Sequence, residues 1–145
     1  MIKLIVIGHG HFATGILSSL ELIAGKQEDI IGIDFVEGMS SEDVKLALKE
    51  AIADSKEVLV LADLLGGTPF KVASALMVEL SDVAMNVISG MNLTMLVEVA
   101  FARMTAESLD ALVAKSVATG KEGIIDWKTL LGSDDEEAND FEGGI

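Results

Sequence analysis

Cysteine is absent from the 145-residue chain, and basic residues are scarce. Without cysteine the chain can form neither disulfides nor thiolate metal sites, and it has no cysteine nucleophile, as is usual in a reducing compartment. Lys and Arg number 10 against 24 Asp and Glu, which gives a formal net charge of -14. Such a chain repels nucleic acid phosphates and anionic membrane surfaces, and no Lys/Arg cluster overcomes the repulsion. We therefore expect no nucleic acid partner.

Long apolar runs are also missing. The apolar stretches fall well short of the roughly 20 residues that cross a bilayer, and the first residues lack the long apolar region and cleavage site of a signal peptide. We expect a cytoplasmic protein without direct membrane insertion. The length suits one domain, which we place at residues 1–131. Residues 132–145 hold six acidic side chains and few apolar ones, a composition that predicts a flexible acidic tail.

Short runs rich in Ile and Val are abundant, and they alternate with segments of helical period. This pattern is typical of a parallel sheet with helices on both faces, because strands buried on both sides are apolar throughout. The four predicted strands are residues 2–8, 30–36, 57–63 and 83–89. The sequence thus predicts a doubly wound, mainly parallel α/β sheet, for which 2-1-3-4 is a common strand order.

Two segments after the fourth strand carry further predictions. Residues 90–104 are apolar nearly all round, which fits a helix covered on more than one side and suggests a subunit interface. Residues 123–127, GIIDW, are expected to form a last short strand.

A histidine and an aspartate follow two of the predicted strands. His9 ends the first strand within IVIGHGHFATGI, residues 5–16, and Asp63 ends the third. With strand order 2-1-3-4 these strands are neighbours, about 4.8 Å apart, so both side chains should meet at the carboxyl edge of the sheet, where ligands bind. A carboxylate that accepts one ring N–H fixes the tautomer and leaves the other nitrogen as a nucleophile.

The residues after the third strand suit an anion. Gly66 and Gly67 let backbone amides approach a ligand closely, Thr68 offers a hydroxyl, and a helix opens behind them. Helix N-termini favour anions, and the turn at Gly10 opens the first helix in the same way. The sequence therefore predicts a phosphoryl group carried on His9 and surrounded by these residues.

The same glycines also allow a dinucleotide-binding interpretation. Gly8, Gly10 and Ala13 match the G-x-G-x-x-[GA] pattern, and Asp34 lies where a ribose-binding acid is expected, roughly 20 residues past the turn. Against this interpretation, a chain of this length leaves no room for a substrate domain. His9 would also place a bulky ring where the pyrophosphate should approach the backbone.

An aspartyl-phosphate receiver domain is a second possible interpretation of the same strand ends. Asp63 stands where such a domain accepts phosphate, but the site needs acidic residues after strand one to hold Mg²⁺, and GHGH stands there. A small binding module with an idle His9 is a third interpretation, which the absence of phosphate transfer would favour. His11 is expected to face solvent and is assigned no role.

Four stretches resemble the IIA components of mannose-type sugar phosphotransferase systems. They are IVIGHGHFATGI, IGIDFVEG, VLADLLGGTPFKVAS and GMNLTMLVEVAFAR, in that order within residues 1–127. The resemblance implies that His9 takes a phosphoryl group from the phosphocarrier protein HPr and passes it to a histidine of a IIB component. It also implies that Asp63 hydrogen-bonds the active histidine and that Thr68 helps to hold the phosphoryl group. Because such a relay needs alignment and charge stabilisation, we expect neither a metal nor an organic cofactor.

The resemblance extends to partners. Proteins of this family form homodimers in which a C-terminal strand crosses to the partner's sheet, which would give residues 123–127 a purpose, and they act with the membrane components IIC and IID through IIB. We further expect the partner proteins to dock beside His9, because exposed apolar residues next to a site mark an interface. This docking face would comprise Phe12, Leu64, Leu65 and Phe70.

Overall fold

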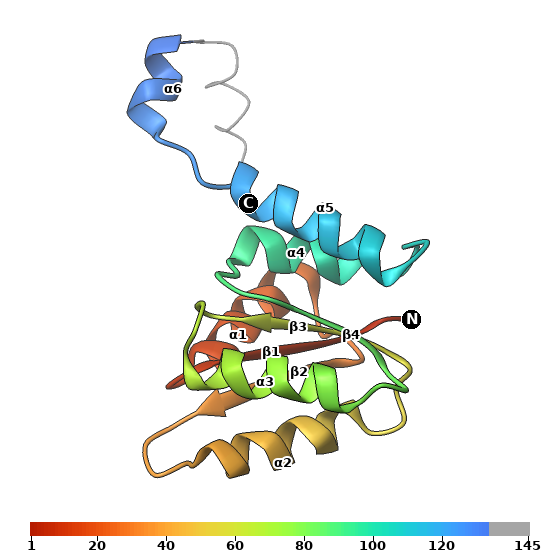
Figure 1. Ribbon diagram of the computed structural model, residues 1–145. Helices are drawn as coiled ribbons and strands as arrows, with labels where there is room; N and C mark the ends of the chain where they lie inside the picture. The colour runs from red at the N-terminus through yellow and green to blue at the C-terminus, as the bar shows by residue number, and fades with distance from the viewer. Residues whose placement is uncertain (134–145) are drawn as a thin grey trace.

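Four parallel strands form the centre of the domain. The computed structural model describes residues 1–133 of the chain. Its strands are β1 (Lys3–His9), β2 (Ile30–Phe35), β3 (Glu57–Ala62) and β4 (Ala84–Ile88). They lie in the order β2-β1-β3-β4, and every neighbouring pair is parallel (Figure 1). The predicted doubly wound sheet and its strand order are confirmed.

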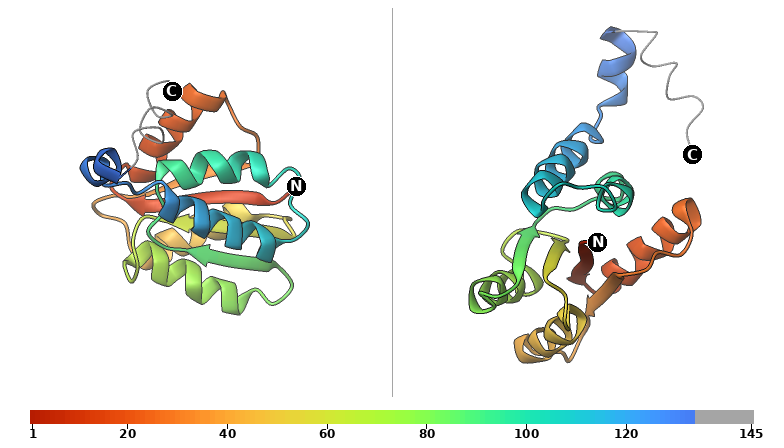
Figure 2. Two further views of the ribbon diagram at one scale, coloured as in Figure 1. Left: turned by 90° about the horizontal axis from the view of Figure 1, so that it is seen from above. Right: turned by 90° about the vertical axis from the view of Figure 1, so that its right-hand side faces the viewer.

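Helices cover both faces of this sheet, as Figure 2 shows from two further sides. One face carries α1 (Phe12–Ala24), α4 (Leu93–Ala102) and α5 (Leu109–Glu122), and the other carries α2 (Ser41–Ile52) and α3 (Thr68–Glu79). Alternate residues of β1 enter the two cores: Leu4 and Val6 face α1, α4 and α5, whereas Ile5 and Ile7 face α2 and α3. Both sets are fully buried, which is why the strands are unbroken apolar runs in the sequence.

Local hydrogen bonds set where most of the helices begin. At the start of α2, Ser40 accepts the backbone N–H of Asp43 and Asp43 accepts that of Ser40, a capping box. Asn92 and Ser108 cap α4 and α5 with their own side chains. The first residue before α1 is His11, whose side chain makes no such cap bond.

The apolar fourth helix is covered from within the chain. α4 packs against α1 and α5. It buries Met95, Leu96, Val99 and Ala100 in the core on that face of the sheet. This packing explains part of the apolar composition of α4 inside the domain. Phe101 of the same helix is 52% exposed, and a subunit interface at this segment stays a prediction.

The strand predicted at residues 123–127 is not formed in this single chain. Residues 124–126 are irregular, and α6 (Trp127–Ser133) follows them. Asp126 accepts hydrogen bonds from the backbone N–H and the hydroxyl of Thr129, as a helix-capping residue does. A strand needs a neighbouring strand for its backbone groups, whereas α6 projects away from the sheet and its helices (Figures 1 and 2). Residues 123–127 therefore form no strand in the single chain, and their pairing with the sheet of a second copy stays a prediction.

The predicted acidic tail begins inside this helix. Gly132 and Ser133 belong to α6, and the rest of the predicted tail lies outside the described residues. Among the helices formed by residues 1–133, none has the length and apolar character needed to cross a membrane.

Candidate active site

The structure brings His9 and Asp63 together at the carboxyl edge of the sheet. His9 is the last residue of β1, and Asp63 directly follows β3, which pairs with β1 up to Ile7 and Ala62. The Nδ1 atom of His9 lies 2.7 Å from Oδ2 of Asp63. The neighbourhood that we predicted from strand order is therefore present.

The Asp63 carboxylate is held by backbone as well as by the ring. Its Oδ2 accepts the His9 backbone N–H at 2.8 Å, and its Oδ1 accepts the Leu64 backbone N–H at 2.9 Å. Burial raises the pKa of Asp63, but these bonds and the His9 ring outweigh that effect and leave the pKa below its ordinary value. The group is thus ionised near neutral pH.

The ionised carboxylate fixes the state of the ring. A carboxylate can only accept hydrogen bonds, so the neutral ring places its proton on Nδ1. The Nε2 atom then carries the lone pair, and the His9 side chain is 44% exposed. The arrangement can present one imidazole nitrogen to an electrophile while the other is held.

The His9 ring lies against the backbone that opens α3. A Cβ atom added to Gly67 would lie 2.6 Å from Cε1 of His9 and 3.2 Å from Nε2. Gly67 is the N-cap residue of α3, and Thr68 is its first helical residue. Unpaired amides at a helix start attract anions, so a group on Nε2 would lie beside them. Gly66 has a φ of +83°, which glycine adopts without strain.

Gly8 has a packing role that the sequence did not disclose. A Cβ atom there would lie 2.7 Å from the Phe12 ring and 3.1 Å from the Asp63 side chain. Gly10, with a φ of +57°, forms the turn after β1. Gly8 thus leaves room for the Asp63 side chain, and Gly10 allows the turn into α1. These two roles explain the G-x-G spacing without a bound dinucleotide.

A ring contact from β2 was also missed. The Phe35 ring meets the His9 ring edge-on, with centroids 5.7 Å apart and planes at 72°. The Phe35 carbonyl accepts the Gly10 backbone N–H at 2.8 Å. The ring contact could have been predicted from the pairing of β1 with β2, because His9 is in register with Phe35.

The residues predicted to form the docking face differ in exposure. Leu64 and Leu65 are exposed beside Asp63, and Leu65 is 72% exposed. Phe12 and Phe70 are half-buried and pack against the two separate cores. The leucines are therefore the accessible part of this surface.

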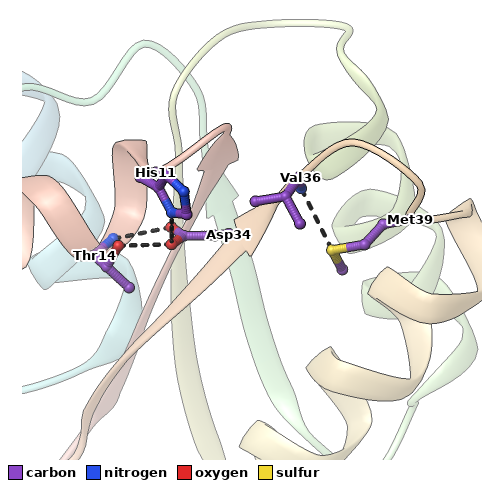
Figure 3. Close-up of polar contacts among 5 residues, drawn as sticks. All are labelled: His11, Thr14, Asp34, Val36 and Met39. Atoms are coloured by element: carbon purple, nitrogen blue, oxygen red, sulfur yellow. Dashed lines mark hydrogen bonds and ion pairs between the residues drawn. The ribbon is translucent and has the colours of Figure 1, made fainter.

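Asp34 is not available to a ribose. Its carboxylate accepts the backbone N–H and the hydroxyl of Thr14, and it is also bonded by His11 (Figure 3). His11 is solvent-facing, as expected, yet it has a partner that we did not predict.

Within residues 1–133, no three His, Asp or Glu side chains are grouped so that they could hold a metal ion.

Comparison with known proteins places this chain in a family. Residues 3–117 match the family described as the PTS system fructose IIA component, where PTS is the phosphotransferase system. The chain belongs to this family. The resemblance stated from the sequence motifs is confirmed. His9 and Asp63 thus lie at the carboxyl edge of the sheet of a IIA protein.

Individual relatives agree with this assignment. The PTS system mannose-specific EIIAB component of Escherichia coli (strain K12) is 41% identical over 124 residues, which are 83% of this chain and 38% of that protein. The chain therefore spans well under half the length of this curated relative. A crystal structure of the phosphotransferase system component EIIA from Streptococcus agalactiae is 55% identical with a TM-score of 0.87, over 89% of this chain and 99% of that one. The mannose/sorbose specific IIA subunit from Enterococcus faecalis is 30% identical with a TM-score of 0.77, over 85% and 92%.

Proposed function

We propose that this IIA protein is a phosphoryl carrier in sugar uptake, which accepts a phosphoryl group from HPr on Nε2 of His9 and passes it to a histidine of a IIB component. The observation that carries the proposal is the 2.7 Å contact of Nδ1 with Asp63, which leaves Nε2 as the reactive nitrogen beside the start of α3. Residues 1–131 would carry this function in the cytoplasm, and IIB would link the protein to the membrane components IIC and IID.

The transfer is a substitution at phosphorus. The Nε2 lone pair of His9 attacks the phosphorus of phosphorylated HPr, the P–N bond to the donor histidine breaks, and its electron pair returns to the donor nitrogen. The Nδ1 proton stays on the ring, and Asp63 balances the positive charge that develops there. Transfer to IIB repeats the step with His9 as the leaving group.

Backbone and hydroxyl donors supply the remaining stabilisation. Charge on the phosphoryl oxygens is best met by donors that are already in place, because they need no reorganisation during the reaction. Gly10, Gly66, Gly67 and Thr68 are the residues that we assign to this role. The relay then needs neither a metal nor an organic cofactor.

Phosphorylation of the purified full chain tests the proposal. The protein is incubated with phosphoenolpyruvate, enzyme I and HPr, and its intact mass is measured under neutral conditions. We expect one phosphate that acid removes, its loss in His9→Ala, and a rate about 10²-fold lower in Asp63→Asn, because the amide leaves the wrong tautomer more populated. His11→Ala is the matched control and should still gain one phosphate. A wild-type protein that gains none, or a His9→Ala protein that gains one, would refute the assignment.

The docking face is tested at one exposed and one half-buried apolar residue. Leu65→Ser and Phe70→Ser should raise the half-saturating concentration of HPr about tenfold each, the effect of losing roughly 1.4 kcal/mol of apolar contact. Leu22→Ser is the control, because Leu22 is exposed near the far end of α1. If Leu65→Ser and Phe70→Ser take phosphate from HPr as the wild type does, the partner docks elsewhere.

A further inference from the structure

A second histidine–carboxylate pair lies at the same edge of the sheet as the first. Nδ1 of His11 is 3.0 Å from Oδ2 of Asp34 (Figure 3). The same carboxylate accepts the Thr14 backbone N–H at 3.0 Å and the Thr14 hydroxyl at 2.6 Å. The Asp34 side chain is only 14% exposed, whereas that of His11 is 82% exposed. The first turn of α1 therefore converges on one largely buried carboxylate at the end of β2.

Asp34 does for α1 what a capping side chain normally does for its own helix. The first amides of a helix lack partners inside the helix, and the N-cap residue His11 supplies no cap bond. α2 and α5, by contrast, are capped by Ser40 and Ser108 from their own chain segments. The position of the start of α1 is thus set by another element, the strand β2.

The segment fixed in this way carries the reactive ring. Only Gly10 and His11 separate His9, the last residue of β1, from the start of α1. On the β2 side, the Phe35 carbonyl accepts the Gly10 N–H at 2.8 Å. Phe35 also touches the His9 ring, with centroids 5.7 Å apart. The turn is therefore held at its beginning by Phe35 and at its end by Asp34, while Asp63 holds the ring from β3.

We infer that Asp34 is a positioning residue for phosphoryl transfer: through Thr14 it fixes the start of α1 against β2 and thereby the direction in which Nε2 of His9 points. The inference rests on the proposed role of His9. In-line transfer between two rings depends on their alignment, and a displacement of about 1 Å can cost 10²-fold in rate. The side-chain hydrogen bonds of Asp34 go to Thr14 and His11 and not to His9, so we expect its effect on the His9 ring to pass through the turn.

Variants of Asp34 and Thr14 test this role. Asp34→Asn can keep an acceptor for the Thr14 N–H but turns a donor toward the Thr14 hydroxyl and His11. We expect its maximal transfer rate from phosphorylated HPr to fall about tenfold with an unchanged half-saturating concentration, because alignment rather than docking is affected. Thr14→Val, which removes only the exposed hydroxyl, should lower the rate about threefold, and Thr14→Ser should restore it.

Ser108→Ala is the matched control for a purely structural effect. It removes the cap of α5, whose start lies away from His9 because α4 runs from the end of β4 back toward the opposite edge of the sheet (Figure 2). We expect it to lower the melting temperature and leave the transfer rate at the wild-type value. If Asp34→Asn and Thr14→Val also transfer at the wild-type rate while folded, Asp34 is a helix cap only and the inference fails.

A spectroscopic measurement separates this inference from the proposed function. Proton and nitrogen NMR of the His9 ring reports the Nδ1–H···Asp63 bond in the unphosphorylated protein. We expect Asp34→Asn and Thr14→Val to shift these resonances and Ser108→Ala to leave them in place. Unchanged His9 resonances in both variants would overturn the inference, whether or not phosphate is transferred. A wild-type protein that takes up no phosphate would refute the proposed function instead.

Discussion

Individual carboxylates control the two histidines at the edge of the sheet. Asp63 bonds the ring and the backbone of His9, and Asp34 bonds the ring of His11 and the backbone of Thr14. In both pairs Nδ1 is the held nitrogen. The difference lies in what surrounds the free nitrogen, since His9 faces the start of α3 and His11 faces solvent.

The lowered pKa values of Asp34 and Asp63 link stability to pH. Each folded carboxyl has a pKa below the ordinary value of 3.8, so the unfolded chain binds protons first as the pH falls. Their stabilisation is present above about pH 5 and is lost as the pH falls through the lowered values. Between about pH 5 and pH 3, we expect the free energy of unfolding in urea to fall more steeply in the wild type than in Asp63→Asn. If the free energy of unfolding depends on pH equally in the two proteins, the pKa of Asp63 is not lowered by folding.

Residue types and spacing predicted His9 and Asp63 but not the contacts of Asp34. The first pair follows from two strand ends that are adjacent in a 2-1-3-4 sheet. The second depends on where a side chain on β2 meets the first turn of α1, a geometry that the twist of the sheet and the packing of a helix decide together. The same acid at the same distance also fits a ribose-binding site, and its bonds to Thr14 and His11 show that its carboxylate is instead used within the chain.

At the scale of elements, the start of α3 is shaped to receive an imidazole. Gly67 has a φ of -71°, which alanine can adopt, so Gly67→Ala acts through the contact with the ring and not through backbone strain. The added methyl would displace His9, and we expect the transfer rate to fall at least about tenfold. The free energy of unfolding should fall by only about 1 kcal/mol, the cost of a poorer N-cap residue.

Gly15→Ala is the control for that substitution. Gly15 lies exposed within α1, and an added Cβ meets no neighbour within 4 Å. It should raise the free energy of unfolding by about 0.5–1 kcal/mol and leave transfer unchanged. A Gly67→Ala protein that transfers as fast as Gly15→Ala would show that the ring does not need this approach to α3.

Most elements could be predicted because both faces of the sheet are covered. Strands buried on both sides must be apolar throughout, and helices that cover them show a stripe. The region after α5 lacks such a constraint, and there residues 124–126 are irregular where a strand was predicted, with α6 following them. Arg103 was also not foreseen: it is buried, and its guanidinium donates to the carbonyls of Ile2, Glu28 and Asp29. Its acceptors are distant in sequence and belong to backbone, so no local pattern indicates them.

At the scale of the whole molecule, the sheet has an edge strand and the C-terminal segment has exposed apolar side chains. β4 lies at one end of the strand order, and an edge strand can accept a further strand. Ile124, Ile125 and Leu131 are exposed large apolar residues beyond α5. We propose that residues 123–127 pair with the sheet of a second copy, so that the carrier is a homodimer.

Sedimentation of truncated chains tests the dimer. The full chain should sediment as a dimer, and a chain ending at Gly123 should sediment as a monomer, because the crossing segment and its apolar surface are removed. A chain ending at Ser133 keeps α6 and should remain dimeric. A monomeric full chain, or a dimer that persists without residues 124–145, would exclude strand exchange as the basis of assembly.

The backbone bonds of Asp63 do not require the imidazole of its neighbour. In His9→Ala the backbone N–H groups of residues 9 and 64 can still donate to that carboxylate. We therefore expect the backbone around the missing ring to keep its conformation. If the proposed function holds, we expect such a protein to bind phosphorylated HPr without accepting its phosphoryl group. Produced together with the wild-type protein, it should compete for HPr and lower sugar uptake as its concentration rises.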